Sequence, residues 1–206
     1  AYLNSFLGNY YGKINKLNNA RICQEKAILS NPYEETFYIN LAITYKFLGS
    51  LDLSIKILEY ILLIHPKNET ALSLHADICF TNLELKKSFS SYENLICLEQ
   101  YSKNVKYKKE YCHKLIISNK FKEAKNILKE LVEEKDLIDV LYYKSLILIE
   151  EKQFKKAFDY ISKCLEIDKQ YVQGYIVKGI ILERQQKFEE AINYLKKALT
   201  IEKNNI

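Results

Sequence analysis

Apolar and small residues recur along the chain in a helical pattern that itself returns about every 34 residues. The final helical stretch, "FEEAINYLKKALTIEKNN" at 188–205, closely matches "FKKAFDYISKCLEIDKQY" at 154–171. The small residue at the fourth position of these stretches recurs at intervals of 34, 34, 36, 33 and 34 residues: Ala20, Ser54, Ser88, Ala124, Ala157 and Ala191. A period between 20 and 50 residues indicates stacked structural repeats.

Two further columns share this period and define the repeating unit. A leucine or phenylalanine lies three positions before each small residue: Leu17, Leu51, Leu85, Phe121, Phe154 and Phe188. A second small residue lies twelve positions before it: Gly8, Ala42, Ala76, Cys112, Ser145 and Gly179. Facing columns of small side chains let two helix axes approach to roughly 8–10 Å. We therefore expect each unit to be a pair of antiparallel helices joined by a short turn, with Gly49 in one such turn.

The columns resemble the tetratricopeptide repeat family, which has a 34-residue unit. The resemblance is carried by "FLGNYY" at 6–11, "NLAITY" at 40–45 and "KGIILERQQKFEEAINYLKKAL" at 178–199. It implies an all-α fold, a right-handed α-solenoid of about 12 helices in stacked antiparallel pairs. It covers the chain as a single array, 1–206, of six repeats: 1–34, 35–68, 69–102, 105–137, 138–171 and 172–205. The 36-residue interval places extra residues near 98–104.

Composition and charge argue against several classes of function. Apolar residues make up 48% of the chain, which is ample for a core, while 5 glycines and 2 prolines favour helix. The net charge of +5 is mild, whereas a duplex-binding protein usually carries a broad basic stripe, so we do not expect a nucleic-acid partner. No apolar run is long enough to cross a membrane. The five cysteines have no paired spacing, so we expect reduced thiols and an intracellular, cytoplasmic setting.

Catalytic chemistry is not expected in this chain. Cys112 and His113 are adjacent, and neighbouring helical residues point about 100° apart, so the two cannot form a nucleophile–base pair. His75 falls in a column held elsewhere by Leu7 and Leu41, which predicts a packed core histidine. The sequence also lacks a glycine-rich phosphate loop and a cluster of metal ligands. We therefore expect no enzyme activity, no cofactor and no metal.

The resemblance implies that the first helices of the repeats line a concave groove. Its lining is taken from the first-helix positions that face away from the partner helix. The predicted groove residues are Tyr2, Phe6, Asn9, Ile39, Asn40, Ile43, Phe47, Leu74, Asp77, Phe80, Lys109, His113, Ile116, Tyr142, Tyr143, Leu146, Ile149, Ile176, Val177 and Ile180. This lining is strongly apolar, and an exposed apolar stripe marks an interaction site, unless strong curvature lets neighbouring helices cover it.

We expect a non-catalytic scaffold that binds a partner peptide or an amphipathic helix in this groove. The groove lacks the cations of the carboxylate clamp that grips chaperone tails in this family, since Ser5, Thr70 and Leu74 stand in their places. Alternatives are a self-associating subunit of a multiprotein assembly, and a regulatory segment of a larger protein whose enzymatic or nucleic-acid-binding part lies outside this chain. Direct RNA binding through "KNVKYKKEY" at 103–111 is a further alternative, although a solvated helix face explains those charges as well.

Overall fold

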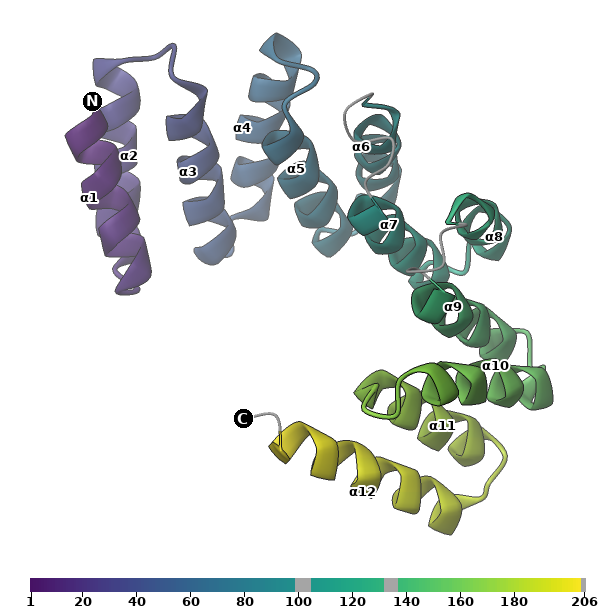
Figure 1. The fold of residues 1–206 in the computed structure, drawn as a ribbon. Helices are drawn as coiled ribbons and strands as arrows, with labels where there is room; N and C mark the ends of the chain where they lie inside the picture. The colour runs from purple at the N-terminus through teal and green to yellow at the C-terminus, as the bar shows by residue number, and fades with distance from the viewer. Residues whose placement is uncertain (99–104, 132–136, 205–206) are drawn as a thin grey trace. The chain divides into compact units, whose positions relative to one another are not determined.

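The computed structural model describes residues 1–98, 105–131 and 137–204 (Figure 1). Within these ranges the chain forms twelve α-helices and no strand, so the predicted all-α class is confirmed. The helices are α1 (Tyr2–Lys13), α2 (Leu17–Ser30), α3 (Glu35–Phe47), α4 (Leu51–Ile64), α5 (Glu69–Thr81), α6 (Leu85–Cys97), α7 (Val105–Ile117), α8 (Phe121–Glu130), α9 (Leu137–Glu150), α10 (Phe154–Ile167), α11 (Val172–Arg184) and α12 (Phe188–Asn204).

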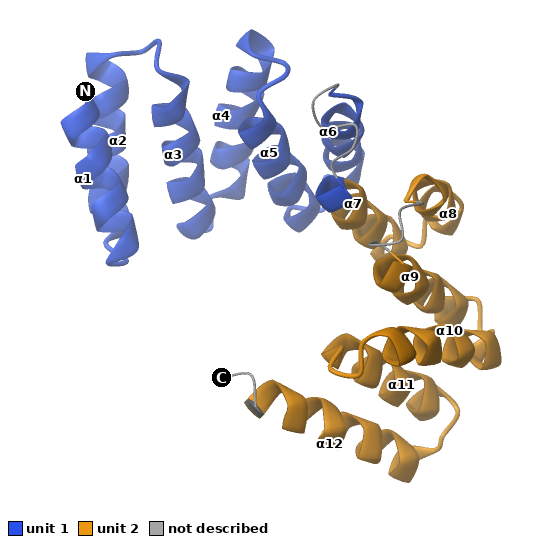
Figure 2. Cartoon of the chain, viewed as in Figure 1, with its two compact units in different colours: residues 1–107 blue, residues 108–206 orange. Residues whose placement is uncertain are grey.

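The helices belong to two compact units, residues 1–107 and 108–206 (Figure 2). In unit 1, α1 packs on α2, α3 on α4 and α5 on α6, and each of these pairs packs on the next. In unit 2, α9 packs on α10, α11 packs on α12, and the two pairs are joined through α10 and α11. That all six repeats form a single array stays a prediction. The extra residues expected near 98–104 lie almost entirely outside the described residues.

Small residues meet where the two helices of a pair touch, as the two columns predict. The Ser54 hydroxyl donates a hydrogen bond of 2.7 Å to the Ala42 carbonyl oxygen, so the two columns are in direct contact in this pair. In the last pair, a Cβ atom added to Gly179 would lie 2.9 Å from the side chain of Leu195. All members of both columns are buried. A larger side chain at these positions would therefore force the helices apart.

The turn inside every pair has the same backbone conformation. The last residue before the second helix caps the first helix by bonding its backbone N–H to a carbonyl five residues earlier, for example from Ser50 to Tyr45 at 2.9 Å. Such a Schellman closure requires a left-handed residue just before the capping residue. The residue there has a positive φ in all six pairs: Asn15, Gly49, Leu83, Asn119, Lys152 and Gln186. Glycine adopts a positive φ without strain, and the sequence analysis placed this turn only at Gly49. Asn15 and Asn119 are also of a residue type that tolerates a positive φ.

Candidate functional site

A hollow of about 310 Å³ in unit 1 brings together four of the predicted groove residues. Asn9 comes from α1, and Asn40, Ile43 and Phe47 come from α3. The rest of the wall consists of Gly8, Gly12, Lys13, Leu17, Gln24 and Thr44. We call this feature the α1–α3 hollow. Its volume lies in the range of small binding sites.

Gln24 and Thr44 form a polar network in the wall of the α1–α3 hollow. Thr44 donates a hydrogen bond to the Gln24 side-chain oxygen at 2.6 Å. The Gln24 amide nitrogen in turn approaches the side-chain oxygen of Asn9 at 3.5 Å. Gln24 is 2% exposed, so these bonds are what satisfies its buried amide.

Asn9 and Asn40 keep unused hydrogen-bonding groups beside this network. The Asn40 amide nitrogen approaches the Ser5 hydroxyl at 3.4 Å. Within the described residues, the Asn9 amide nitrogen donates no hydrogen bond and the Asn40 side-chain oxygen accepts none. The hollow therefore presents an unused amide nitrogen on Asn9 and an unused amide oxygen on Asn40. A peptide group offers the complementary acceptor and donor.

Large apolar side chains stand exposed on the first helices α1 and α3. Phe47, which lines the α1–α3 hollow, is 67% exposed. Towards the N-terminus of α1, outside the hollow, Phe6 is 72% exposed and the Tyr2 hydroxyl donates a hydrogen bond of 2.8 Å to Glu34. Leaving aromatic surface of this size in water costs free energy that a bound apolar side chain would recover.

Three further predicted residues of unit 1 lie on α5 and are half-buried. Leu74 packs against the core cluster that includes Leu58 and Ile78. Asp77 accepts a hydrogen bond from the Tyr92 hydroxyl at 2.9 Å, which fixes its carboxylate. Phe80 is also half-buried and is not part of the hollow.

In unit 2, the predicted groove residues gather around tyrosine side chains. The rings of Tyr142 and Tyr143 lie 5.3 Å apart, and Tyr171 stands perpendicular to Tyr142 at 5.9 Å. His113 is 6.3 Å from the Tyr143 ring. Burial raises the pKa of the Tyr142, Tyr143 and Tyr171 hydroxyls, so these phenols stay neutral at physiological pH.

Charged and aliphatic residues complete this part of unit 2. Lys109 forms an ion pair with Asp139. Ile176 is 39% exposed, while Leu146 and Ile180 are half-buried. Lys108, which the RNA-binding alternative requires, pairs with Glu130 at 3.0 Å, so part of that basic segment is already neutralised. Lys103 lies outside the described residues.

Four of the predicted groove residues are buried, so their assignment to the groove lining was wrong. Ile39 is 8% exposed, Ile116 is 6%, Ile149 is 5% and Val177 is 2%. Ile39 belongs to the core cluster of unit 1, and Ile149 and Val177 belong to the core cluster of unit 2. The helix-face argument failed here because a first helix packs on its neighbours as well as on its own partner.

Gln24 is the main site residue that the sequence analysis missed. It comes from a second helix, whereas only first helices were considered as lining. A signal was present, because the same column of the other repeats holds only bulky apolar residues: Leu58, Tyr92, Leu128, Ile161 and Leu195. A polar residue in an otherwise apolar column indicates a local polar environment.

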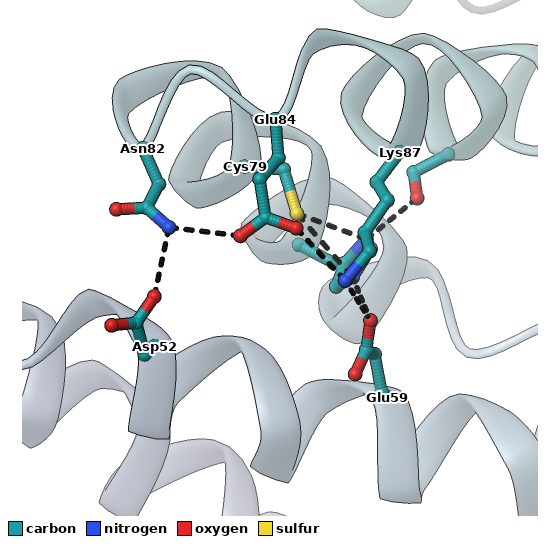
Figure 3. Close-up of polar contacts among 8 residues, drawn as sticks. Asp52, Glu59, Cys79, Asn82, Glu84 and Lys87 are labelled. Carbon is teal, nitrogen blue, oxygen red and sulfur yellow. Dashed lines mark hydrogen bonds and ion pairs between the residues drawn. The ribbon is translucent and has the colours of Figure 1, made fainter.

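A second polar cluster, between α4, α5 and α6 of unit 1, has the residue types of a catalytic site (Figure 3). The Cys79 sulfur lies 3.4 Å from Nε2 of His75, and the Ser91 hydroxyl lies 2.8 Å from Nδ1. The Glu59 carboxylate approaches His75 Nε2 at 3.8 Å and pairs with Lys87 at 2.8 Å.

The protonation states of this cluster oppose nucleophilic catalysis. Burial raises the pKa of the Cys79 thiol to about 12, so it stays protonated and unreactive. Burial also lowers the pKa of His75, against the opposing effect of Glu59. His75 is 5% exposed, as expected for a packed core histidine. The cluster stabilises the contact of the three helices.

Cys112, the other cysteine weighed for catalysis in the sequence, lies in a similarly buried environment. Cys112 is fully buried, and its sulfur points at the Ala124 carbonyl oxygen at 3.9 Å. Burial raises its pKa to about 12. All five cysteines are free. Over the described residues, no three His, Cys, Asp or Glu side chains are grouped so that they could hold a metal ion.

These helix pairs, with small residues at their contacts and a Schellman turn in each, define a helical repeat protein of the tetratricopeptide class. Solved structures share the fold. A tetratricopeptide repeat protein from Parabacteroides merdae superposes with a TM-score of 0.72 at 18% identity, covering 97% of this chain and 78% of its own. PilW, a type IV pilus biogenesis factor, gives 0.71 at 15% identity, with 94% and 89% covered. PilF from Pseudomonas aeruginosa gives 0.60 at 19%, with 80% and 76% covered.

The chain belongs to the AimR transcriptional regulator-like family, whose model matches residues 2–173. A tetratricopeptide repeat model matches residues 172–205, which is the sixth predicted repeat. The resemblance drawn from the repeat columns is therefore confirmed. The chain has no match among curated proteins. No helix within the described ranges is both long and apolar enough to cross a bilayer.

Proposed function

We propose that this chain is a non-catalytic scaffold that binds a peptide segment of a partner protein in the α1–α3 hollow. The observation that carries the proposal is the pair of unused amide groups on Asn9 and Asn40 beside the exposed ring of Phe47. A peptide in an extended conformation offers backbone groups for the two asparagines. Its side chains would cover Phe47 and Ile43.

The surface of unit 2 around Tyr142, Tyr143 and Tyr171, which we call the tyrosine surface, suits the same kind of partner. Tyrosine combines a large apolar ring with a polar hydroxyl and loses little conformational entropy on binding, so it is enriched at protein interfaces. Tyr142, Tyr143 and the exposed Ile176 would contact apolar side chains of the partner. An amphipathic helix is the second form of partner that such a surface accommodates.

A second candidate function is regulatory, and the family match favours it. The family model is described as transcriptional regulator-like and covers residues 2–173. Under this hypothesis the repeats are the part of a regulator that binds the partner, and the part that binds nucleic acid lies outside this chain. The two candidates are compatible, because a peptide bound by the repeats would be the signal that such a regulator reads.

Selection of displayed random peptides against the chain tests the proposal. We expect selected peptides to bind the wild-type chain and to bind the Asn9→Ala/Asn40→Ala variant at least about tenfold more weakly, because two hydrogen bonds to the backbone are lost. Asn193→Ala/Asn126→Ala is the matched control, since both asparagines are exposed and outside the hollow. Equal affinity for the two double variants would refute the role of the hollow.

A further inference from the structure

A second cavity, in unit 2, carries a different chemistry from the tyrosine surface. It has a volume of about 450 Å³ and lies between α8, α9 and α10. Its lining combines four lysines with an apolar floor: Lys125, Lys129, Lys144, Lys156, Leu128, Ile147, Leu148, Tyr160 and Gln153. Among the residues that the structure describes, no carboxylate belongs to the lining. We call it the lysine cavity.

The positive charge of the lysine cavity is only partly balanced within the described residues. Lys125 pairs with Glu151 at 2.6 Å, and Lys156 donates to the side-chain oxygen of Gln153 at 3.0 Å. Lys144 lies 5.9 Å from the centre of the Tyr160 ring, a contact that leaves its charge intact. Lys129 has no acidic partner in the part of the chain that the structure describes. Four lysines thus line the cavity, and among the described residues one carboxylate, that of Glu151, pairs with one of them.

Helix geometry separates the lysine cavity from the predicted groove. Lys144 and Tyr142 are two residues apart on α9, which places their side chains about 200° apart around the helix. Leu148 and Leu146 are separated in the same way. The cavity therefore opens on another face of α9 from the one that carries Tyr142 and Leu146, and it is not part of the proposed peptide site.

We propose that the lysine cavity binds a small phosphate ester. Lysine ammonium groups act as compact point charges that suit phosphate, and four of them match a ligand with several negative charges. The floor formed by the buried Leu128 and Ile147 gives the organic part of the ligand an apolar contact. The volume matches that of a small-molecule site. This site goes beyond the proposed peptide binding and does not depend on it.

Calorimetric titration of the full chain at about 50 mM salt tests the proposal with ATP, inorganic tripolyphosphate and adenosine as probes. We expect ATP to bind more tightly than tripolyphosphate, because only ATP reaches the apolar floor, and adenosine to bind far more weakly than ATP. In the Lys129→Gln/Lys144→Gln variant the affinity for ATP should fall at least about tenfold. Circular dichroism checks that the variant remains folded.

Lys196→Gln/Lys203→Gln is the matched control, because it removes the same charge from exposed lysines of α12 in the same unit. We expect its affinity for ATP to stay within about twofold of the wild type. Failure of ATP to bind, an equal loss in both double variants, or adenosine binding as tightly as ATP would overturn the proposal. A single-stranded oligonucleotide that binds and that ATP fails to displace would overturn it in favour of a nucleic-acid surface.

Discussion

Single positions in this chain show when a repeat column predicts an environment and when it does not. The columns of small residues predicted burial correctly at Ala124, Ala157 and Ala191, which are at most 5% exposed. The same reasoning placed His75 in the core, because Leu7 and Leu41 hold its column in the first two repeats. It gave no hint that His75 would contact Ser91 and Cys79, since those contacts depend on neighbouring helices. A column of small residues therefore predicts that its positions are buried, but a column does not predict which side chains a residue contacts.

His75 should make the stability of the chain depend on pH. Burial lowers its pKa in the folded state, although Glu59 and Glu84 oppose this and Lys87 adds to it. The unfolded chain therefore takes up a proton near pH 6.5 that the folded chain does not, and folding becomes less favourable as the pH falls below that value. In His75→Leu this loss disappears, and leucine already occupies the column in the first two repeats, as Leu7 and Leu41.

Urea unfolding between pH 7.5 and 5 measures this difference. We expect the free energy of unfolding of the wild type to fall relative to that of His75→Leu as the pH decreases. His113, whose pKa burial also lowers, is present in both proteins and cancels in the comparison. Parallel pH profiles of the two proteins would show that His75 titrates alike in the folded and unfolded states.

Among elements, the helices were predictable and the turns were not. The repeat columns predicted about twelve paired helices, and α12 begins at Phe188, a member of the leucine or phenylalanine column. The positive φ of Leu83 and Lys152 had no local signal, because neither residue favours that conformation. Their conformation is imposed by the two helices that the turn joins. Only an alignment of the turns, in which Gly49 and Asn15 hold the same position, would have predicted the positive φ of Leu83 and Lys152.

Leu83 should therefore be a place where the chain can be stabilised. Its φ is 62° and its side chain is 82% exposed, so little packing offsets the strain. A left-handed conformation costs an ordinary residue about 1–2 kcal/mol, of which glycine's extra chain entropy cancels about 0.5–1 kcal/mol. We expect Leu83→Gly to raise the free energy of unfolding by up to about 1 kcal/mol in urea unfolding. Leu83→Ala keeps a Cβ atom, and a gain equal to that of glycine would contradict the explanation.

For the whole molecule, the sequence predicted the class of protein and a set of binding residues, but not the place of the site. The repeat columns led to the tetratricopeptide class, which the family models confirm. Of the predicted groove residues, the α1–α3 hollow combines only Asn9, Asn40, Ile43 and Phe47. A cavity depends on how far apart neighbouring helices lie, and periodicity carries no information on that distance. The lysine cavity escaped prediction for the same reason.

Gly12 offers a direct way to close the α1–α3 hollow without disturbing the core. It lines the hollow, and a Cβ atom added to it would meet nothing within 4 Å. A phenylalanine at this position would therefore extend into the hollow, and it also suits a helix better than glycine does. Gly12→Ala is the matched control, because it adds the Cβ atom without filling the hollow.

The most direct measurement compares the affinity of one display-selected peptide for the wild type, Gly12→Ala and Gly12→Phe by calorimetry. If the peptide occupies the α1–α3 hollow, Gly12→Ala binds like the wild type and Gly12→Phe binds at least about a hundredfold more weakly, since the site is filled. Undiminished binding to a folded Gly12→Phe protein would contradict the account.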